Sequence, residues 1–446
     1  MKFYVETFGC QMNVADGLEM GRRLKARGFE ATTDPALADV VLVNTCTVRQ
    51  HAEDKALSRL GRLADWRAGG RRLLVMAGCA AERLGPRLSR RFPQVDLVIG
   101  AKSIARFDEI LDERWPRTAF DGRREWEEAW GWGAGLDDTT LPGEGVAGFV
   151  TIMRGCNFSC SYCVVPAVRG REVYRPALSV LDEAAARAAR GQWELTLLGQ
   201  TVNSYRPGGP NPGRDGADIN DFSDLLRALS ALPGVERLRF MSPHPQYIDD
   251  KFAAVFAETP AIAPHLHLPV QSGSDAVLSR MRRNHTRAKY LEKTRLLRTA
   301  RPEMSFTTDF IVGFPGETED DFESTVSLVG EADLDGAYVF KYSPRPGTAS
   351  AGSADDVPPA EKERRHAALQ ALLDERARAK LAALAGTIQD VLVEAVLPAD
   401  AGWEWETRTA HNRKMFVRAD RAARPGERRR VRVTGAEGKT LYGDPT

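Results

Sequence analysis

The sequence predicts an α/β protein in three parts: an N-terminal open parallel α/β sheet, a central partial (β/α)6 barrel and a C-terminal small antiparallel β-barrel. Strands rich in Val, Leu and Ile alternate with amphipathic helices in the first part, and a strand–helix unit recurs six times in the second. Helical periodicity is lost over residues 387–446, where glycines separate short strands.

The first part, residues 1–115, carries three cysteines that each follow an apolar strand. The predicted strands are 2–6, 39–44, 72–77 and 95–99, with helices expected at 15–27, 48–68 and 81–92. We name Cys10, Cys46 and Cys79 the dispersed set. The carboxyl ends of parallel strands share one edge of a sheet, so these cysteines are expected to converge there on a metal cluster. Ordinary buried cysteines are the alternative.

Residues 116–146 read as a linker, because the segment is charged and rich in turn-forming glycines. It contains Trp126, Trp130 and Trp132, which we expect to pack against a domain surface rather than to contact substrate.

The central part, residues 147–385, is expected to form a barrel that is open on one side, since it has six strand–helix units rather than eight. The predicted strands are 147–153, 194–200, 237–242, 265–272, 305–314 and 336–343. Helices are expected at 180–189, 275–283, 287–300 and 319–331, followed by a long helix at 360–385. Functional residues of such barrels lie at the carboxyl ends of the strands.

Three further cysteines, Cys156, Cys160 and Cys163, follow the first of these strands with a C-x3-C-x2-C spacing. We name them the compact set. Zinc sites usually use four ligands and C-x2-C pairs, and ferredoxin clusters use four cysteines. Three thiolates leave one iron of a [4Fe-4S] cluster open to bind another molecule, and this interpretation is favoured over zinc or structural cysteines. Two such sets predict two clusters.

The last part, residues 387–446, combines predicted strands at 390–395, 414–417 and 429–433 with a basic stretch. Between residues 408 and 432 ten Lys and Arg residues accompany only Asp420 and Glu427. A solvated charged face is the usual meaning of such a run, but on a small β-barrel binding to a phosphate backbone is favoured. The candidate RNA contacts are Arg413, Lys414, Arg428, Arg429 and Arg430.

The chain as a whole shows no sign of a membrane or export role. Its net charge is +1, so any nucleic-acid surface must be local. No apolar run approaches the roughly 20 residues of a membrane helix, and the first residues form a strand with an acid rather than a signal peptide. We therefore expect a cytoplasmic protein without membrane contact.

Seven short runs carry a resemblance to a known family. They are TFGCQMN at 7–13, NTC at 44–46, AGC at 77–79, RGC at 154–156, LGQTVN at 198–203, HLPVQSG at 267–273 and DFIVGFPGET at 309–318. The compact set resembles that of the radical S-adenosylmethionine (radical SAM) superfamily, and the whole chain resembles the methylthiotransferases. These enzymes have an N-terminal three-cysteine domain, a radical SAM barrel and a C-terminal TRAM domain.

The resemblance implies two [4Fe-4S] clusters and S-adenosylmethionine as cofactors. The compact set would hold the cluster that binds S-adenosylmethionine, and the dispersed set would hold an auxiliary cluster that carries sulfur. The implied partners are tRNA, an electron donor such as flavodoxin or ferredoxin, and a donor of iron–sulfur units or sulfur. A zinc-stabilised RNA-binding protein is disfavoured, because it needs neither six barrel strands nor two cysteine sets.

Within the family the chain is most similar to the MiaB type, through LGQTVN and FKYSPRPGT at 340–348. That type methylthiolates C2 of N6-isopentenyladenosine at position 37, on the 3′ side of the tRNA anticodon. Branches that act on threonylcarbamoyladenosine tRNA or on a ribosomal-protein aspartate are the alternatives. Ala167, Val168 and Tyr174 depart from the usual Tyr, Thr and Ser.

Cofactor contacts are expected near the barrel mouth, from an aromatic residue beside the last cysteine and from residues at strand ends. These are Tyr162, Gln200, Asn203, Gln271, Ser272, Asp309 and Gly313, the glycine allowing backbone to approach adenine. Val164, Val165 and Val168 are expected to line a pocket for the isopentenyl chain. His265 and His267 share one strand face, where interior packing is favoured over a metal pair.

Overall fold

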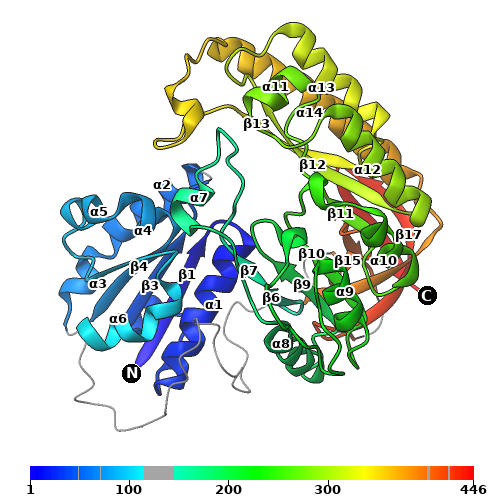
Figure 1. Ribbon diagram of the computed structural model, residues 1–446. Helices are drawn as coiled ribbons and strands as arrows, with labels where there is room; N and C mark the ends of the chain where they lie inside the picture. Colours follow the sequence, from blue (N-terminus) through cyan, green and yellow to red (C-terminus); the bar gives the residue numbers. More distant parts are fainter. Residues whose placement is uncertain (49, 71, 115–144, 399–401, 420–421) are drawn as a thin grey trace. The chain divides into compact units, whose positions relative to one another are not determined.

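The computed structural model describes the chain except for residues 49, 71, 115–144, 399–401 and 420–421 (Figure 1). The described residues form two compact units. The first contains those before 145 together with 153–158 and 164–175, and the second contains 145–152, 159–163 and 176–446. Most of the predicted linker, with its three tryptophans, lies outside the described residues. The predicted domain boundaries stay a prediction.

The first unit is built on a five-stranded parallel sheet, which confirms the predicted open α/β sheet. Its order is β2-β1-β3-β4-β5. The strands are β1 (Lys2–Phe8), β2 (Glu30–Ala31), β3 (Val40–Thr45), β4 (Leu73–Gly78) and β5 (Leu97–Gly100). In the central strand β3, Val40 and Leu42 pack into one apolar core while Val41 and Val43 pack into another, so both faces of the sheet are buried.

Helices cover both faces of this sheet (Figure 1). One face is covered by α1 (Gln11–Ala26), α6 (Phe107–Arg114) and α7 (Val165–Arg169), and the other by α2 (Gln50–Arg62), α3 (Ala64–Ala68), α4 (Cys79–Leu84) and α5 (Pro86–Arg91). The helix expected at 81–92 is broken because Gly85 has φ +49 and is followed by Pro86, which starts a new helix. The first unit also contains the short pair β7 (Met153–Arg154) and β8 (Val173–Tyr174).

The second unit contains six parallel strands in sequence order, and the predicted partial barrel is confirmed. They are β6 (Gly148–Thr151), β9 (Glu194–Leu198), β10 (Arg237–Phe240), β11 (His265–His267), β12 (Ser305–Val312) and β13 (Gly336–Lys341). Two three-stranded sheets, β10-β9-β6 and β11-β12-β13, are joined by a parallel bridge between Leu238 and Ile262. The helices are α8 (Ala177–Ala189), α9 (Phe222–Ser230), α10 (Asp250–Glu258), α11 (Asp275–Arg280), α12 (Arg287–Ala300), α13 (Glu319–Glu331) and α14 (Pro359–Ala382).

The C-terminal residues form a closed five-stranded barrel in the order β14-β15-β16-β18-β17. The strands are β14 (Ile388–Val396), β15 (Trp405–Thr409), β16 (Lys414–Val417), β17 (Arg428–Glu437) and β18 (Thr440–Pro445). The pair β16–β18 is parallel and the other pairs are antiparallel. In β17, Val431 and Val433 point into the core of this barrel, whereas the alternate residues Arg430 and Arg432 are exposed, as expected for a strand.

This C-terminal barrel packs against the amino-terminal ends of the larger barrel's strands. Arg239 of β10 donates to the carbonyls of Thr409 and Ala410 at 2.7 and 3.0 Å. Trp193, directly before β9, donates to the Gly426 carbonyl at 2.7 Å. The C-terminal barrel therefore lies at the end opposite to the carboxyl ends of the strands. No helix in the described ranges combines the length and apolarity needed to cross a membrane.

Candidate active site

The structure brings the dispersed set together at one edge of the first sheet. Phe8, Thr45 and Gly78, the last residues of β1, β3 and β4, are level in register. Cys10 caps α1, Cys46 directly follows β3 and Cys79 is the first residue of α4. The convergence expected from the strand ends is thus what the backbone shows.

Two glycines allow this close approach. Gly9 has φ +144, and a Cβ there would lie 2.5 Å from the Cβ of Cys46. Gly78 has φ +95, and a Cβ there would lie 2.2 Å from Asn44 Oδ1 and 2.8 Å from the Thr45 carbonyl. Since no side chain fits at either position, the chain can turn from strand to cysteine only with glycine.

Buried polar groups hold the cysteine edge. The Cys10 thiol donates to Asn13 Oδ1 at 3.2 Å, and Asn44 Nδ2 donates to the Asn13 carbonyl at 2.6 Å. The backbone N–H of Val48 donates to Cys46 Sγ at 3.3 Å. Both asparagines are fully buried, so their amides fix the loops that carry the thiols.

A buried arginine, Arg169 of α7, supplies positive charge to the dispersed set. Its Nη2 donates to Asp16 Oδ2 at 2.7 Å, while its Nη1 is buried without a hydrogen-bond partner in the described structure. Hydrogen bonding with Cys46, together with the charge of Arg169, lowers the pKa of Cys10 to about 6 against the raising effect of burial. Burial raises the pKa of Cys79. Three thiols beside a cation with a spare N–H fit an anionic iron–sulfur cluster.

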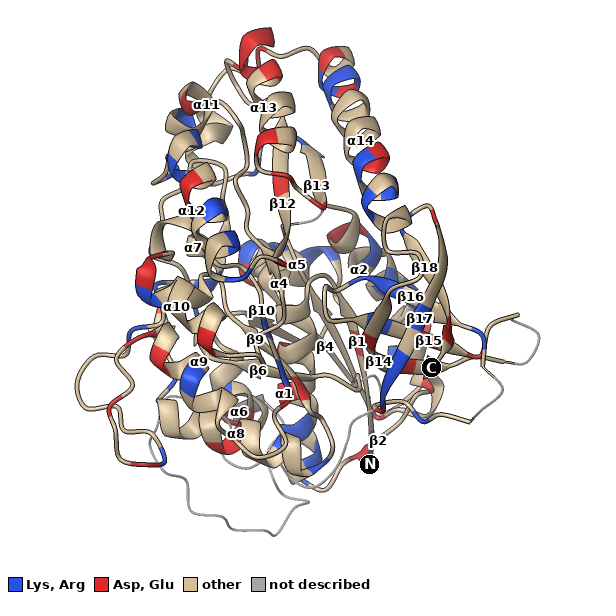
Figure 2. Cartoon of the chain, turned by 90° about the vertical axis from the view of Figure 1, so that its right-hand side faces the viewer, with Lys and Arg blue, Asp and Glu red and all other residues tan. Residues whose placement is uncertain are grey.

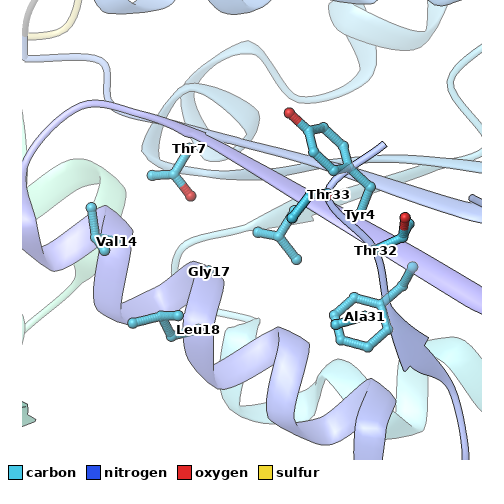
Figure 3. A pocket seen from close by; sticks show the side chains of 10 residues that line it. Tyr4, Thr7, Val14, Gly17, Leu18, Ala31, Thr32 and Thr33 are labelled. Atoms are coloured by element: carbon cyan, nitrogen blue, oxygen red, sulfur yellow. The ribbon is translucent and has the colours of Figure 1, made fainter. Parts of the chain in front are cut away.

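A cavity of about 350 Å³ lies beside this edge, between β1, α1 and the residues that follow β2 (Figure 3). It is lined by hydroxyl and apolar groups, among them Tyr4, Thr7, Val14, Leu18 and Thr33. Thr7 and Val14 are near neighbours of Cys10 in the chain.

The compact set begins at a tight turn after β7. Gly155 has φ +82, and a Cβ there would lie 1.9 Å from the Arg171 carbonyl, so the turn requires glycine. The N–H of Cys156 donates to the Gly170 carbonyl at 3.1 Å. All six cysteines are free thiols, and the three of the compact set are only partly buried.

Cys160 and Cys163 are held by the second unit. Cys163 N–H donates to the Cys160 carbonyl at 3.1 Å. Between them, the Ser161 N–H and hydroxyl donate to the carbonyls of Met281 and Arg280 at 3.0 and 2.8 Å. Arg283 Nη1 donates to Cys160 Sγ at 3.6 Å. Partly exposed thiols with a donor on one sulfur fit a cluster with an open iron.

Tyr162 packs against an apolar core formed by Val277, Met281, Phe314 and Tyr342, and its ring centroid lies 6.4 Å from that of Phe314. Burial raises the pKa of its hydroxyl, so the phenol is neutral. Its role as a cofactor contact stays a prediction.

Several predicted cofactor contacts already bind the protein itself. Asn203 Nδ2 donates to the His244 carbonyl at 2.9 Å and its Oδ1 accepts from the His244 N–H at 2.7 Å. The Ser272 hydroxyl, on a residue 1% exposed, accepts from the Ser274 N–H at 3.2 Å. Their side chains position loops at the barrel mouth. Gln200 is half-buried just past β9.

The remaining predicted cofactor contacts differ in backbone conformation, exposure and packing; they are Gln271, Asp309 and Gly313. Gln271 has φ +80 and makes backbone bonds to β12, whereas Asp309 stays half-buried, with Oδ1 3.4 Å from His267 Nε2. Gly313 is required by Lys362, whose Cγ would lie 2.3 Å from a Cβ. Packing against Lys362 is thus one reason for glycine here, and approach of its backbone to adenine stays a prediction.

The two histidines of β11 both lie against one hydroxyl. His265 Nε2 and His267 Nδ1 both lie 3.0 Å from Thr307 Oγ1. Burial lowers the pKa of His265 well below its usual value, so it is neutral. Interior packing, the favoured interpretation, agrees with this geometry.

The expected valine pocket is wrong for two of its three residues. Val164 and Val168 are 5% and 2% exposed and pack in the core of the first unit with Ile99. They are buried because α7, which follows the compact set, joins the apolar core on one face of the first sheet. Val165 is half-buried.

The basic residues of the C-terminal barrel are largely paired, and acidic positions are interspersed with them (Figure 2). Over residues 387–446 there are eleven Lys and Arg against nine Asp and Glu, so the basic excess is confined to one stretch. The pairs are Arg413–Asp335 at 2.9 Å, Lys414–Glu406 at 2.7 Å, Arg428–Glu236 at 2.7 Å and Arg429–Glu427. Arg430 is exposed.

Sequence reasoning missed the charged network around the dispersed set. Arg154 Nη2 lies 2.5 Å from Glu19 Oε2, and Arg154 Nη1 lies 3.1 Å from Asp16 Oδ1. Asp16 is fully buried although it lies on the helix that follows Cys10. The sequence signal that could have revealed this network is Asp16 itself. A carboxylate on the apolar face of a helix becomes buried, and a buried carboxylate needs a cationic partner.

Comparison with known proteins agrees with this architecture. Residues 2–100 match the family described as uncharacterized protein family UPF0004, and residues 150–329 match the radical SAM superfamily. The radical SAM methyltransferase TsrM from Kitasatospora setae shares the fold with a TM-score of 0.55 at 17% identity, covering 78% of this chain and 77% of TsrM. The radical enzyme OxsB has a TM-score of 0.50 at 10% identity, covering 82% and 56%.

Three curated relatives are tRNA-2-methylthio-N(6)-dimethylallyladenosine synthases. The enzyme of Anaeromyxobacter sp. (strain K) is 42% identical over 99% of this chain and 94% of its own length. The enzyme of Geobacter sulfurreducens is 44% identical over 88% of this chain and 86% of its own length. The enzyme of Chromobacterium violaceum is 41% identical over 99% of this chain and 98% of its own length.

The fold and the family matches define a radical SAM protein with a UPF0004 region at its N-terminus. Its similarity to the curated relatives extends over nearly the full length of both chains. The chain belongs to the family of tRNA-2-methylthio-N(6)-dimethylallyladenosine synthases.

Proposed function

We propose that the protein is a tRNA methylthiotransferase that adds a methylthio group to C2 of N6-isopentenyladenosine at position 37. The observation that carries the proposal is the presence of two separate three-cysteine sets in a chain whose relatives are synthases of that nucleoside. The branches that act on threonylcarbamoyladenosine or on a ribosomal protein are disfavoured, since the relatives named above belong to neither.

The two sets have different roles in this proposal. Cys156, Cys160 and Cys163 would hold a [4Fe-4S] cluster that binds S-adenosylmethionine, and the dispersed set would hold an auxiliary [4Fe-4S] cluster that carries sulfur. Adenine C2 has no acidic proton for a general base to remove, so the bound cofactors supply the one-electron chemistry and the protein positions them. The chain's own contribution is to orient thiols, balance charge and present the base.

An exposed aromatic pair on β13 suits presentation of the base. Tyr338 and Phe340 are 61% and 41% exposed and are level with Asp309 and Ile311 of β12. The Tyr338 ring lies 5.9 Å from that of His267. Phe306 of β12 points the other way, under Arg298 of α12, so the aromatic pair faces the barrel interior. Aromatic side chains bind unstacked bases by stacking.

The proposed partners follow from the chemistry. The substrate is tRNA, an electron donor such as flavodoxin or ferredoxin supplies electrons, and a donor of iron–sulfur units or sulfur replaces the sulfur consumed. We further propose a cytoplasmic location, where these donors and tRNA occur together.

Mass spectrometry of tRNA nucleosides tests the proposal. A deletion strain should lack 2-methylthio-N6-isopentenyladenosine and accumulate the unthiolated nucleoside. The wild-type gene should restore it, and a gene with all three cysteines of the compact set changed to Ala should not. In vitro, prenylated anticodon-stem RNA should react and unprenylated RNA should react little. Equal reaction of both RNAs, or an unchanged nucleoside profile, would contradict the assignment.

A further inference from the structure

Arg283 lies directly behind one thiol of the compact set. It follows α11, and its Nη2 donates to the Pro269 carbonyl at 2.9 Å while its Nη1 donates to Cys160 Sγ at 3.6 Å. Pro269 comes just after β11, so this contact fixes the guanidinium at the carboxyl ends of the strands. Its Nε–H is buried and without a hydrogen-bond partner in the described part of the chain.

The charge of Arg283 has no carboxylate counterpart in the part of the chain that the structure describes. Among the described residues no Asp or Glu lies within ion-pair distance of it. The two nearby imidazoles are neutral, because burial, followed by the charge of Arg283, lowers the pKa of His244 to about 2 and that of His285 to about 3. Arg283 is half-buried with its Nε–H inside the protein, and a cation so placed without a counter-ion is costly, so an anionic partner is expected on the side of the thiols.

We propose that Arg283 tunes the cluster held by the compact set, donating a hydrogen bond to the Cys160 sulfur and offsetting the negative charge gained on reduction. This inference rests on one part of the proposed function, that the compact set holds a [4Fe-4S] cluster. Hydrogen bonds to cysteine sulfur and nearby positive charge stabilise the more negative, reduced state, so they raise the reduction potential. Arg283 would act through the Cys160 sulfur, so it is a positioning residue.

Arg169 provides an internal comparison. It is buried near the dispersed set, but Asp16 neutralises it at 2.7 Å. A paired arginine presents little net charge, so Arg283 should affect the potential of its cluster more than Arg169 affects that of the auxiliary cluster.

The test is a redox titration of the full-length protein with both clusters assembled. Electron paramagnetic resonance follows the cluster of the compact set, identified as the signal that changes when S-adenosylmethionine is added. Arg283→Met should lower the midpoint so that, at the wild-type midpoint, the ratio of reduced to oxidised cluster falls about tenfold, which is about 59 mV for one electron. Arg295→Met removes the same charge from an exposed position on α12 and should leave the midpoint unchanged.

Two further variants separate charge from hydrogen bonding. Arg283→Lys keeps the positive charge and Arg283→Gln keeps a hydrogen-bond donor. Each should therefore lower the midpoint potential by only part of the amount expected for Arg283→Met. Resonance Raman spectra should show stronger iron–sulfur(Cys) stretching when the donor is lost. An unchanged midpoint in Met, Lys and Gln variants that hold full iron, or an equal shift in Arg295→Met, would overturn the proposal. Because no RNA is needed, failure of the wild type to modify tRNA would bear on the proposed function alone.

Discussion

Arg169 lies beside the dispersed set and Arg283 beside the compact set, and the two arginines differ in how their charge is balanced. Arg169 is balanced by Asp16, which also lies 3.1 Å from Arg154. Within the described ranges, the guanidinium of Arg283 donates only to a sulfur and a carbonyl. The first site is therefore electrostatically complete before a cluster binds, whereas the second gains its counter-charge with the cluster.

Replacing Asp16 by Asn should destabilise the protein by about 3–5 kcal/mol, because it leaves two arginines near the dispersed set without their shared carboxylate. Urea unfolding measured with the far-UV circular dichroism signal gives the change in free energy. Glu109→Gln is the matched control, since its pair with Arg106 is 62% exposed on both sides and should cost less than about 1 kcal/mol. Similar costs for the two variants would contradict the buried-network interpretation.

Gly78→Ala should abolish assembly of the auxiliary cluster. The added Cβ meets Asn44 and the Thr45 carbonyl, so the turn into Cys79 must move. Gly28→Ala is the control, because Gly28 has a similar φ of +86 but nothing within 4 Å of the added Cβ. It should cost about 1–2 kcal/mol through backbone strain alone and keep all iron. Iron analysis should give about four irons per chain for Gly78→Ala and about eight for Gly28→Ala.

Tyr338→Ala should weaken binding of prenylated anticodon-stem RNA about tenfold, as expected for loss of one stacking contact. Tyr338→Phe keeps the ring and should bind normally. Leu178→Ala removes another exposed apolar side chain, on α8, and should have no effect. Fluorescence anisotropy with labelled RNA measures the three affinities, and equal binding by all variants would exclude stacking at β13.

At the scale of elements, the strands and the cysteine edge were predictable because both follow from local pattern. Buried parallel strands are continuous apolar runs, as in Val40–Thr45, and Cys46 follows such a run at once. Once strands are parallel, their carboxyl ends must meet, so the convergence of the dispersed set needed no knowledge of side-chain contacts.

The parts that sequence reasoning missed depend on contacts distant in the chain. Nothing local shows that α7 packs on the first sheet, because Val168 there contacts residues more than sixty positions away. The strand β15 was missed because its five residues include only one large apolar side chain, Trp405, and the other four are polar. Gly313 was interpreted from its position at a strand end, although the neighbour that requires it, Lys362, lies on α14.

Because the two cysteine sets are held by different strands, they should be separable by mutation. Changing the compact set to Ala should leave about four irons and abolish cleavage of S-adenosylmethionine. Changing the dispersed set should spare cleavage and abolish sulfur transfer. Iron content and 5′-deoxyadenosine formation measure the two properties. Loss of all iron in both variants would show that the sets assemble as one.

At the scale of the whole molecule, we predict that different arginines of the C-terminal barrel serve packing and RNA binding. Arg430→Ala should weaken tRNA binding and reduce the salt slope, log K against log salt concentration, by about one, since one phosphate contact is lost. Arg413→Ala should leave the slope unchanged and lower the melting temperature, because Arg413 is paired with Asp335 of the larger barrel. An unchanged slope in Arg430→Ala would assign the basic face a purely structural role.

The placement of the C-terminal barrel sets a minimum length for RNA that uses both ends of the second unit. The barrel packs where the strands begin and Cys160 lies where they end, and β12 spans eight residues, or about 26 Å. If the spacing of about 3.4 Å per nucleotide of a DNA strand is taken as a guide, an RNA strand that reaches from the cysteine end to the C-terminal barrel needs about eight nucleotides. We therefore expect an RNA stem of that length to reach both ends, whereas a four-nucleotide fragment should react equally well in wild type and Arg430→Ala.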